Sequence, residues 1–260
     1  MRSIEEYQQK VEFVFCDLDD TLTNNGMLED DAYAALWKLH KNNIKIIPIT
    51  GRPAGWCEMI ARWWPVLAVI GENGAFYFQY DRQQKKMLRQ YSQSKQLRRA
   101  NQDKLYKLKE KILQEVPGAA LASDQFCRVM DIAVDFCEDV EQLSKEDIQK
   151  IVDIFENAGA KAKISSIHVN AWFGDHDKLS MCKTFCEQSL QMKWEEMLKK
   201  AVFIGDSPND APMFAAFPQS VGVANIQDFQ GQIKDLPAYV CSKRAGKGFV
   251  EFSKRLLDIL

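Results

Sequence analysis

The sequence predicts an α/β protein whose core is a doubly wound, Rossmann-like parallel sheet carrying an inserted α+β domain. Short apolar runs alternate with helix-like stretches at both ends of the chain, as is typical of buried parallel strands covered by helices. The middle of the chain lacks this alternation. We therefore expect residues 1–80 and 174–260 to form the core domain and residues 81–173 to form the inserted domain.

Each half of the expected core domain follows the layered pattern. In the first half we expect strands at 11–16, 44–50 and 66–71 and helices at 30–41 and 54–64, which make two successive β-α-β units. In the second half we expect strands at 201–205, 220–223 and 239–241, the last at a sheet edge, and helices at 210–216 and 248–260.

The middle region is predicted to hold a different set of elements. We expect a hairpin of strands 76–80 and 88–92, a charged helix at 96–115, an alternating strand at 128–136, a helix at 145–157 and one or two strands within 164–172. This succession is the reason for expecting a separate α+β domain.

Composition favours a protein that acts on small molecules. The chain has 260 residues, is 46% hydrophobic and carries a net charge of -2 from interspersed acidic and basic residues, which indicates neither nucleic acid nor a membrane as partner. The first ten residues are polar, so we expect a cytoplasmic protein. Seven scattered cysteines and three histidines favour reduced thiols over disulfides or zinc. Nothing in the sequence indicates an oligomeric state.

Two acidic loops follow predicted strands. Asp17 and Asp19 come directly after strand 11–16, and Asp206 and Asp210 follow strand 201–205. Ligand sites in open α/β sheets lie at the carboxyl ends of the strands, so these carboxylates are candidates for an oxygen-rich magnesium site. Either loop alone is also explained as a cap of the helix that follows it.

Two further segments offer groups that suit a phosphate. Thr50, Gly51 and Arg52 end the second strand and supply a hydroxyl, a close backbone approach and a cation, although the same residues are compatible with a helix start. Lys178 stands where the chain re-enters the core and is either a surface lysine or a counter-charge for phosphate. Because all of these groups fall at strand ends or at the domain junction, together they indicate one site.

These segments resemble the motifs of the haloacid dehalogenase (HAD) superfamily, and more closely its type IIB, Cof-like sugar phosphatases, over nearly the whole chain. Asp17–Thr21 resembles the first motif, Thr50–Arg52 the second, Lys178 the third and Gly205–Asp210 the fourth. Gly71–Ala75 resembles the Asn-Gly-Ala turn that precedes the cap in this subfamily. The resemblance implies that the inserted domain is a cap of type C2B.

The resemblance also implies a function, that of a magnesium-dependent phosphatase acting on a small phosphomonoester such as a sugar phosphate. Asp17 would attack phosphorus to form an aspartyl phosphate, and Asp19 would serve as acid and then as base. The Asp17 carboxylate, the Asp19 backbone carbonyl and Asp206 would hold Mg²⁺. The phosphoryl group and substrate would be bound by Thr50, Gly51, Arg52, Lys178 and Asn209, with Asp210 supporting Lys178 or the water shell of the metal.

Three other functions are compatible with parts of this pattern. A phosphomutase of the same superfamily would keep Asp17 and Asp19 but return the phosphoryl group to a sugar. A phospho-acceptor signalling domain would need an aspartate at the end of the third strand, where the sequence has Gly71. A non-catalytic binding protein is disfavoured because all the motif residues are present together.

The substrate-selecting residues are expected in the inserted domain. His168, Asn170 and Trp172 alternate along a predicted strand and would share one face, where they would contact the leaving group or form an ordinary sheet face.

Overall fold

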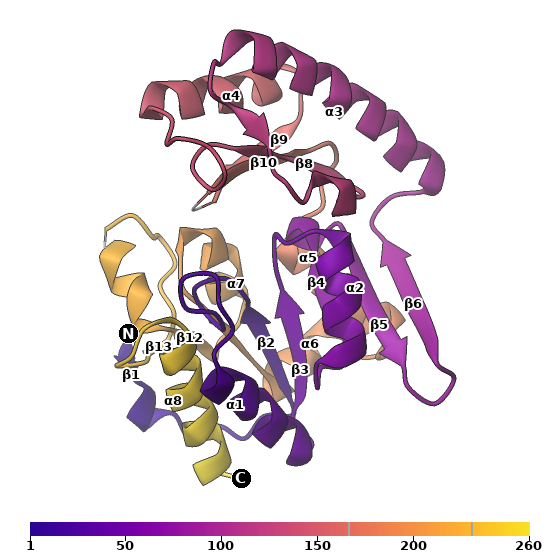
Figure 1. The fold of residues 1–260 in the computed structure, drawn as a ribbon. Helices are drawn as coiled ribbons and strands as arrows, with labels where there is room; N and C mark the ends of the chain where they lie inside the picture. The colour runs from indigo at the N-terminus through magenta and orange to yellow at the C-terminus, as the bar shows by residue number, and fades with distance from the viewer. Residues whose placement is uncertain (166, 230) are drawn as a thin grey trace.

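A nine-stranded mixed sheet forms the larger part of the molecule (Figure 1). The computed structural model describes residues 1–165, 167–229 and 231–260. The strand order is β1-β13-β12-β11-β2-β3-β4-β5-β6, with seven parallel strands followed by the antiparallel β5 and β6. The strands are β1 Arg2–Ser3, β2 Phe13–Asp17, β3 Lys45–Ile49, β4 Val69–Gly71, β5 Phe76–Asp81, β6 Lys86–Tyr91, β11 Ala201–Gly205, β12 Ser220–Gly222 and β13 Tyr239–Val240.

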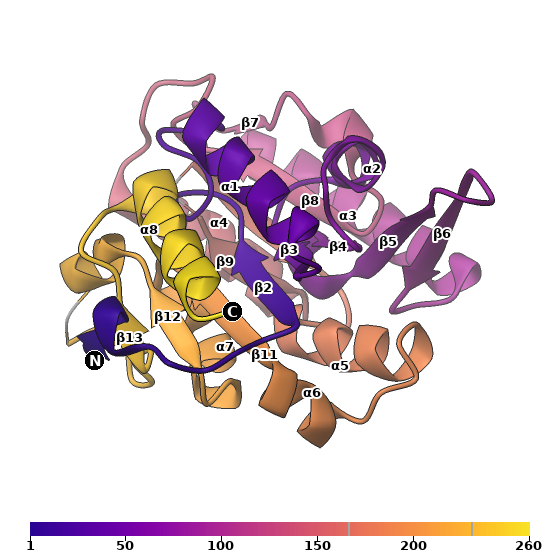
Figure 2. The same cartoon turned by 90° about the horizontal axis from the view of Figure 1, so that it is seen from below.

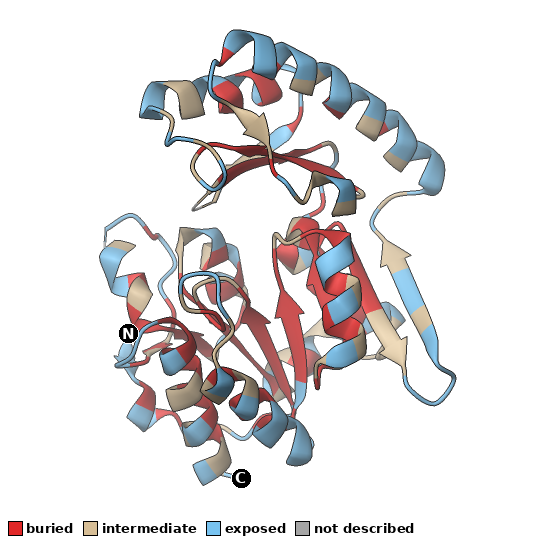
Figure 3. Ribbon diagram, viewed as in Figure 1, coloured by how far each residue is buried: buried red, intermediate tan, exposed pale blue. Residues whose placement is uncertain are grey.

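Helices cover both faces of this sheet because successive strand residues point to opposite sides (Figure 2). In β2, Val14 and Cys16 pack on the side of α1 (Asp30–Lys41), α2 (Ala54–Trp63) and α8 (Ala245–Asp258). Phe13 and Phe15 pack on the opposite side, with α5 (Lys178–Gln188), α6 (Trp194–Lys200) and α7 (Ala211–Ala216). The central strands are therefore buried on both faces, as expected for a doubly wound sheet (Figure 3).

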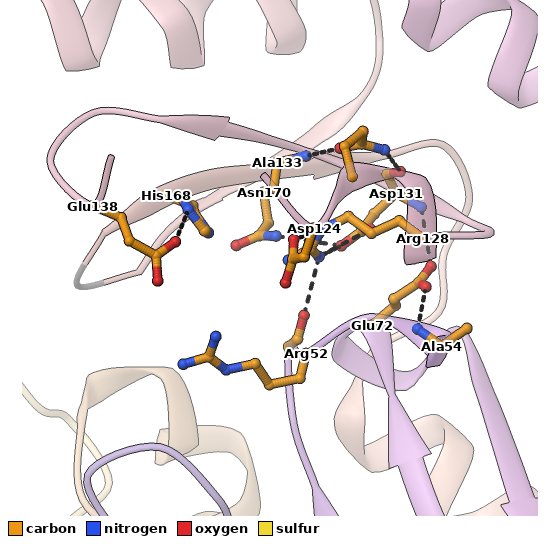
Figure 4. A network of polar contacts seen from close by, with 12 residues as sticks. Arg52, Ala54, Glu72, Asp124, Arg128, Asp131, Ala133, Glu138, His168 and Asn170 are labelled. Carbon is orange, nitrogen blue, oxygen red and sulfur yellow. Dashed lines mark hydrogen bonds and ion pairs between the residues drawn. The ribbon is translucent and has the colours of Figure 1, made fainter. Parts of the chain in front are cut away.

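A second, antiparallel sheet lies above the carboxyl ends of the central strands (Figure 1). Its order is β7-β8-β10-β9, formed by Ala120–Leu121, Asp131–Asp135, His168–Trp172 and Lys161–Ile164. Helices α3 (Lys95–Glu115) and α4 (Lys145–Asn157) cover its outer face and pack on alternating apolar residues such as Ile132, Val134 and Val169. The alternate residues of these strands, which include Asp131 and Asn170, have their side chains on the other face, toward the larger sheet (Figure 4).

The predicted fold class is confirmed, and most elements lie where the sequence placed them. Helices α1 and α4 begin and end at the expected residues. The expected hairpin forms, but it extends the nine-stranded sheet instead of belonging to the middle region. The division into two domains, with boundaries at residues 80 and 173, stays a proposal. Strand β6, which ends at Tyr91, pairs with β5 in the nine-stranded sheet.

Three features of the core differ from the expectations. β13 is not an edge strand, because β1 pairs with it on the outside. Helices α5 and α6 were not predicted, since the expected elements stop at residue 172 and resume at 201. The helix expected at 210–216 is preceded by a 3-10 turn over Pro208–Asp210 and begins as α7 at Ala211.

Two findings bear on the environment of the chain. Within residues 1–165, 167–229 and 231–260, no helix has both the length and the apolar character needed to cross a membrane. Cys16, Cys57, Cys127, Cys182, Cys186 and Cys241 are free thiols.

The turn after β4 fixes where the chain re-enters the core. Glu72, Asn73 and Gly74 have φ values of 44°, 56° and 98°, so three consecutive residues adopt left-handed conformations. A Cβ atom on Gly74 would lie 2.0 Å from the carbonyl oxygen of Asp177, the residue that caps α5. This contact holds the first residue of α5, Lys178, against the carboxyl ends of the sheet.

We expect Gly74→Ala to destabilise the protein by more than about 2 kcal/mol, because left-handed strain adds to a clash with backbone atoms. Gly159→Ala is the matched control, since Gly159 also has a positive φ, 77°, but its Cβ would meet nothing within 4 Å. The control should lose only about 1 kcal/mol. Urea denaturation, monitored by tryptophan fluorescence, measures the free energy of unfolding of both variants. Equal losses in the two would show that the close approach of Gly74 to Asp177 is unimportant.

Candidate functional site

The carboxyl ends of β2, β3 and β11 meet beneath the second sheet and enclose a cavity of about 390 Å³. Asp17 ends β2, Thr50 follows β3 and Asp206 follows β11, so neighbouring parallel strands bring the predicted motif residues together. Of the predicted site residues, the cavity is lined by Asp17, Asp19, Gly51, Arg52, Lys178, Asp206 and Asn209. Thr50 and Asp210 are fully buried behind this lining.

A buried lysine bridges two carboxylates at the base of the cavity. Lys178 Nζ donates to Asp17 Oδ1 at 2.6 Å and to Asp210 Oδ1 at 2.8 Å. Burial lowers the pKa of Lys178, but the charges of Asp17 and Asp210 outweigh this effect and raise the pKa above its ordinary value. Lys178 is therefore a fixed cation, and only Oδ2 of Asp17 remains free of this ion pair.

Asp206 completes a cluster with the chemistry of a cation site. Carboxylate oxygens of Asp17, Asp206 and Asp210 lie within 4.8 Å of one another. Burial, followed by the charges of Asp17 and Asp210, raises the pKa of Asp206 to about 9. Asp210 uses one oxygen for Lys178 and the other for the Asp206 N–H, at 3.2 Å. Asp17 and Asp206 thus offer the oxygen ligands that a hard divalent cation takes.

An ion pair joins the loop after β3 to the loop after β2. Arg52 binds the Asp19 carboxylate through Nε and a terminal nitrogen, the shortest contact being 2.9 Å. Its guanidinium also lies over the Trp56 ring, 4.7 Å from the centroid. The sequence predicted Arg52 as a ligand of phosphate, whereas here the guanidinium holds the predicted acid/base residue.

Thr50 is positioned by its own loop. Its hydroxyl oxygen accepts a hydrogen bond from the Arg52 N–H at 3.0 Å, which leaves the hydroxyl proton free for another acceptor. Gly51 packs against the Asn73 side chain, which also lines the cavity. The loop after β3 is thereby packed against the turn after β4.

The second sheet supplies the opposite wall of the cavity (Figure 4). His168 and Asn170 from β10 line the cavity, as one sequence interpretation expected, together with Arg128 from the segment before β8. Trp172 does not line it and instead stacks on His176, with ring centroids 5.6 Å apart. Asn170 donates to Asp131 Oδ2 at 3.4 Å, and Arg128 donates to the same carboxylate at 3.0 Å.

Sequence reasoning missed Glu72, which joins the two walls. Its carboxylate is fully buried and accepts the Ala54 N–H at 3.0 Å on the core side. On the other side it accepts the N–H groups of Val129, Met130 and Asp131, at 3.0, 2.7 and 3.2 Å. Arg128 adds a contact to the Gly51 carbonyl oxygen at 3.2 Å. An acidic residue directly after an apolar strand was the available signal.

We expect Glu72→Gln to destabilise the protein by about 2–5 kcal/mol. The nitrogen of the new amide would face two of the four buried N–H groups and cannot accept hydrogen bonds from them. Amide hydrogen exchange at residues 129–131 should accelerate. Glu58→Gln is the control, since Glu58 makes only surface ion pairs with Arg62 and Arg89, and it should cost less than about 1 kcal/mol. Unchanged exchange at 129–131 in Glu72→Gln would contradict the bridging role.

Comparisons with known proteins agree with this geometry. The haloacid dehalogenase-like hydrolase family matches residues 14–125. A Thermoplasma acidophilum protein superposes with a TM-score of 0.75 at 16% identity, covering 97% of this chain and 100% of that one. A haloacid dehalogenase-like hydrolase from Bacteroides thetaiotaomicron gives 0.69 at 15% identity, with 95% and 100% covered. The sucrose-phosphatase of Synechocystis sp., in complex with sucrose and phosphate, gives 0.64 at 12% identity, with 95% and 98% covered.

No curated protein is significantly similar in sequence to this chain. At identities of 12–16% the solved structures show a shared fold. The family match covers the segment that carries the first two motifs, and the structure brings the third and fourth motifs to the same cavity. The chain is thus similar to haloacid dehalogenase-like hydrolases in the sequence of residues 14–125 and in its fold.

Proposed function

We propose that the protein is a magnesium-dependent phosphatase that hydrolyses a small phosphomonoester through an aspartyl phosphate on Asp17. The observation that carries the proposal is the buried Asp17–Lys178–Asp210 bridge beside Asp206, at the base of a cavity large enough for a small metabolite. The match of residues 14–125 to the haloacid dehalogenase-like hydrolase family supports the hydrolytic reaction. The fold shared with a sucrose-phosphatase supports a sugar phosphate or a related metabolite as substrate.

In this mechanism, Asp17 Oδ2 attacks phosphorus while Lys178 holds Oδ1. The bond from phosphorus to the alcohol oxygen breaks, and Asp19 gives a proton to that oxygen. Asp19 then takes a proton from a water molecule, whose oxygen attacks phosphorus and releases phosphate from Asp17. For either transfer the Asp19 carboxylate must be freed from Arg52, which binds it in this structure.

Other residues of the site would bind the phosphoryl group. The free hydroxyl proton of Thr50 and the ammonium of Lys178 are donors for its oxygens, and Asn209 lines the same cavity. Asp210 positions Lys178 and the Asp206 backbone. The carboxylates of Asp17 and Asp206, with the Asp19 backbone carbonyl, would hold Mg²⁺. When bound, the cation neutralises the carboxylates and polarises a phosphoryl oxygen.

We expect Asp17→Asn to lower kcat for p-nitrophenyl phosphate by on the order of 10³-fold or more, since the amide is not a nucleophile. The fold should be retained at some cost in stability, because Asn has the shape of Asp and the Asp210 carboxylate still compensates the charge of Lys178. Thermal unfolding checks the fold. Turnover within tenfold of wild type would contradict the mechanism, and phosphate transfer back to a sugar without release would favour a phosphomutase.

We expect chelation of divalent cations to abolish phosphate release and added Mg²⁺ to restore it. Asp206→Asn should raise the Mg²⁺ concentration needed for half-maximal activity by about tenfold or more, because one charged ligand is lost. Asp228→Asn, at a surface ion pair with Arg244, is the control and should leave that concentration unchanged. Full activity after chelation would contradict the metal assignment.

A further inference from the structure

Lys163 lies on the wall of the cavity that faces the proposed phosphoryl site. It belongs to β9 and pairs in register with Asn170 of β10, so the two side chains leave the second sheet on the same face. Both residues line the cavity. Residues of the opposite face, such as Ala162 and Ala171, pack with the helices that cover the sheet. The pleat of the sheet therefore directs Lys163 toward the core domain.

The other cationic side chains that line the cavity each have a carboxylate partner. Arg52 binds Asp19, and Lys178 binds Asp17 and Asp210. Arg128 is paired with Asp124 and Asp131. His168 also lines the cavity but is not counted as a cation, because burial lowers its pKa. For Lys163, by contrast, no ion pair or hydrogen bond to its ammonium occurs within residues 1–165, 167–229 and 231–260.

The surroundings of Lys163 favour an anion as its missing partner. The side chain is half-buried. Burial and then the positive charge of Lys178 lower its pKa, and the more distant charges of Asp210 and Asp177 offset this effect only in part. Lysine ammonium groups normally remain in water or find a counter-charge. A negatively charged group in the cavity would supply that counter-charge.

The position of Lys163 separates this anion from the phosphoryl group that is transferred. The phosphoryl group must reach Asp17 at the carboxyl end of β2, whereas Lys163 stands on the second sheet, next to Asn170. The amide nitrogen of Asn170 donates to Asp131, and its carbonyl oxygen has no hydrogen-bond donor among the described residues. This wall therefore offers the leaving group one cation that has no carboxylate partner, Lys163, and one hydrogen-bond acceptor, the side-chain oxygen of Asn170.

We propose that the substrate carries a second anionic group on its leaving group, a carboxylate or another phosphate, which binds Lys163, and a hydroxyl that donates to Asn170. This inference rests on the proposed phosphatase function and names its substrate class.

The test uses substrate pairs that differ by one anionic group. 3-Phosphoglycerate is compared with glycerol 3-phosphate, 6-phosphogluconate with glucitol 6-phosphate, and fructose 1,6-bisphosphate with fructose 6-phosphate. In at least one pair we expect wild-type kcat/KM to be about tenfold or more higher for the more anionic member, as one charge-assisted contact provides. The carboxylate and bisphosphate pairs distinguish the two sources of charge.

Variants assign that preference to Lys163. Lys163→Met should reduce the preference in the favoured pair by about tenfold. Lys161→Met is the matched control, because Lys161 lies on the same strand, pairs with Asp175 and does not line the cavity, and it should leave the preference intact. Absence of a preference in every pair, or an equal loss for both members in Lys163→Met, would overturn the inference. An equal loss would place Lys163 on the transferred phosphoryl group instead.

Failure of the phosphatase function is recognised separately. If the wild type released no phosphate from any compound, including p-nitrophenyl phosphate, the proposed function would be wrong. Calorimetric titration of the same pairs into wild type and Lys163→Met would then still test the anion site. Tighter binding of the anionic member that depends on Lys163 supports it, and equal binding of both members overturns it.

Discussion

The organisation of the site depends on one buried arrangement of charges, in which Lys178 bridges Asp17 and Asp210. Removing one partner from such a buried pair typically costs about 3–5 kcal/mol, because the remaining charge is left without compensation. The fold therefore has to bring three distant segments to within hydrogen-bond distance. Parallel pairing of β2 with β11 aligns Asp17 with the loop of Asp210, and the Gly74 contact places the start of α5 beside them.

A second constraint acts between the two sheets. The buried carboxylate of Glu72 binds backbone N–H groups from both walls of the cavity, and Arg128 reaches back to the loop of Gly51. Hydrogen bonds to backbone groups fix position more strictly than contacts between long side chains do. These hydrogen bonds thus fix the position of the wall that carries Lys163 and Asn170 relative to the wall that carries Asp17.

The sequence was most informative where position along a strand decides which side chains lie together. Asp17 and Asp206 were found because parallel strands end at the same edge, and Lys178 because the resemblance identified its motif. The sequence assigned Arg52 to phosphate, and in the structure Arg52 binds Asp19, because a sequence does not reveal which anions a flexible cation contacts. The hairpin β5–β6 was expected in the middle region, because its pairing with β4 is a tertiary contact that the sequence does not show. The bridging role of Glu72 depends on segments 57 or more residues away.

Strand β6 is an edge strand of the nine-stranded sheet, where another strand could pair. An outer strand of a large sheet presents unpaired backbone groups, on which another chain can add a strand. β6 carries the exposed side chains of Lys86 and Arg89, and the strand at the far end of the sheet, β1, has only two residues. Charge at one border and brevity at the other both disfavour the addition of a further strand at the edges of the nine-stranded sheet.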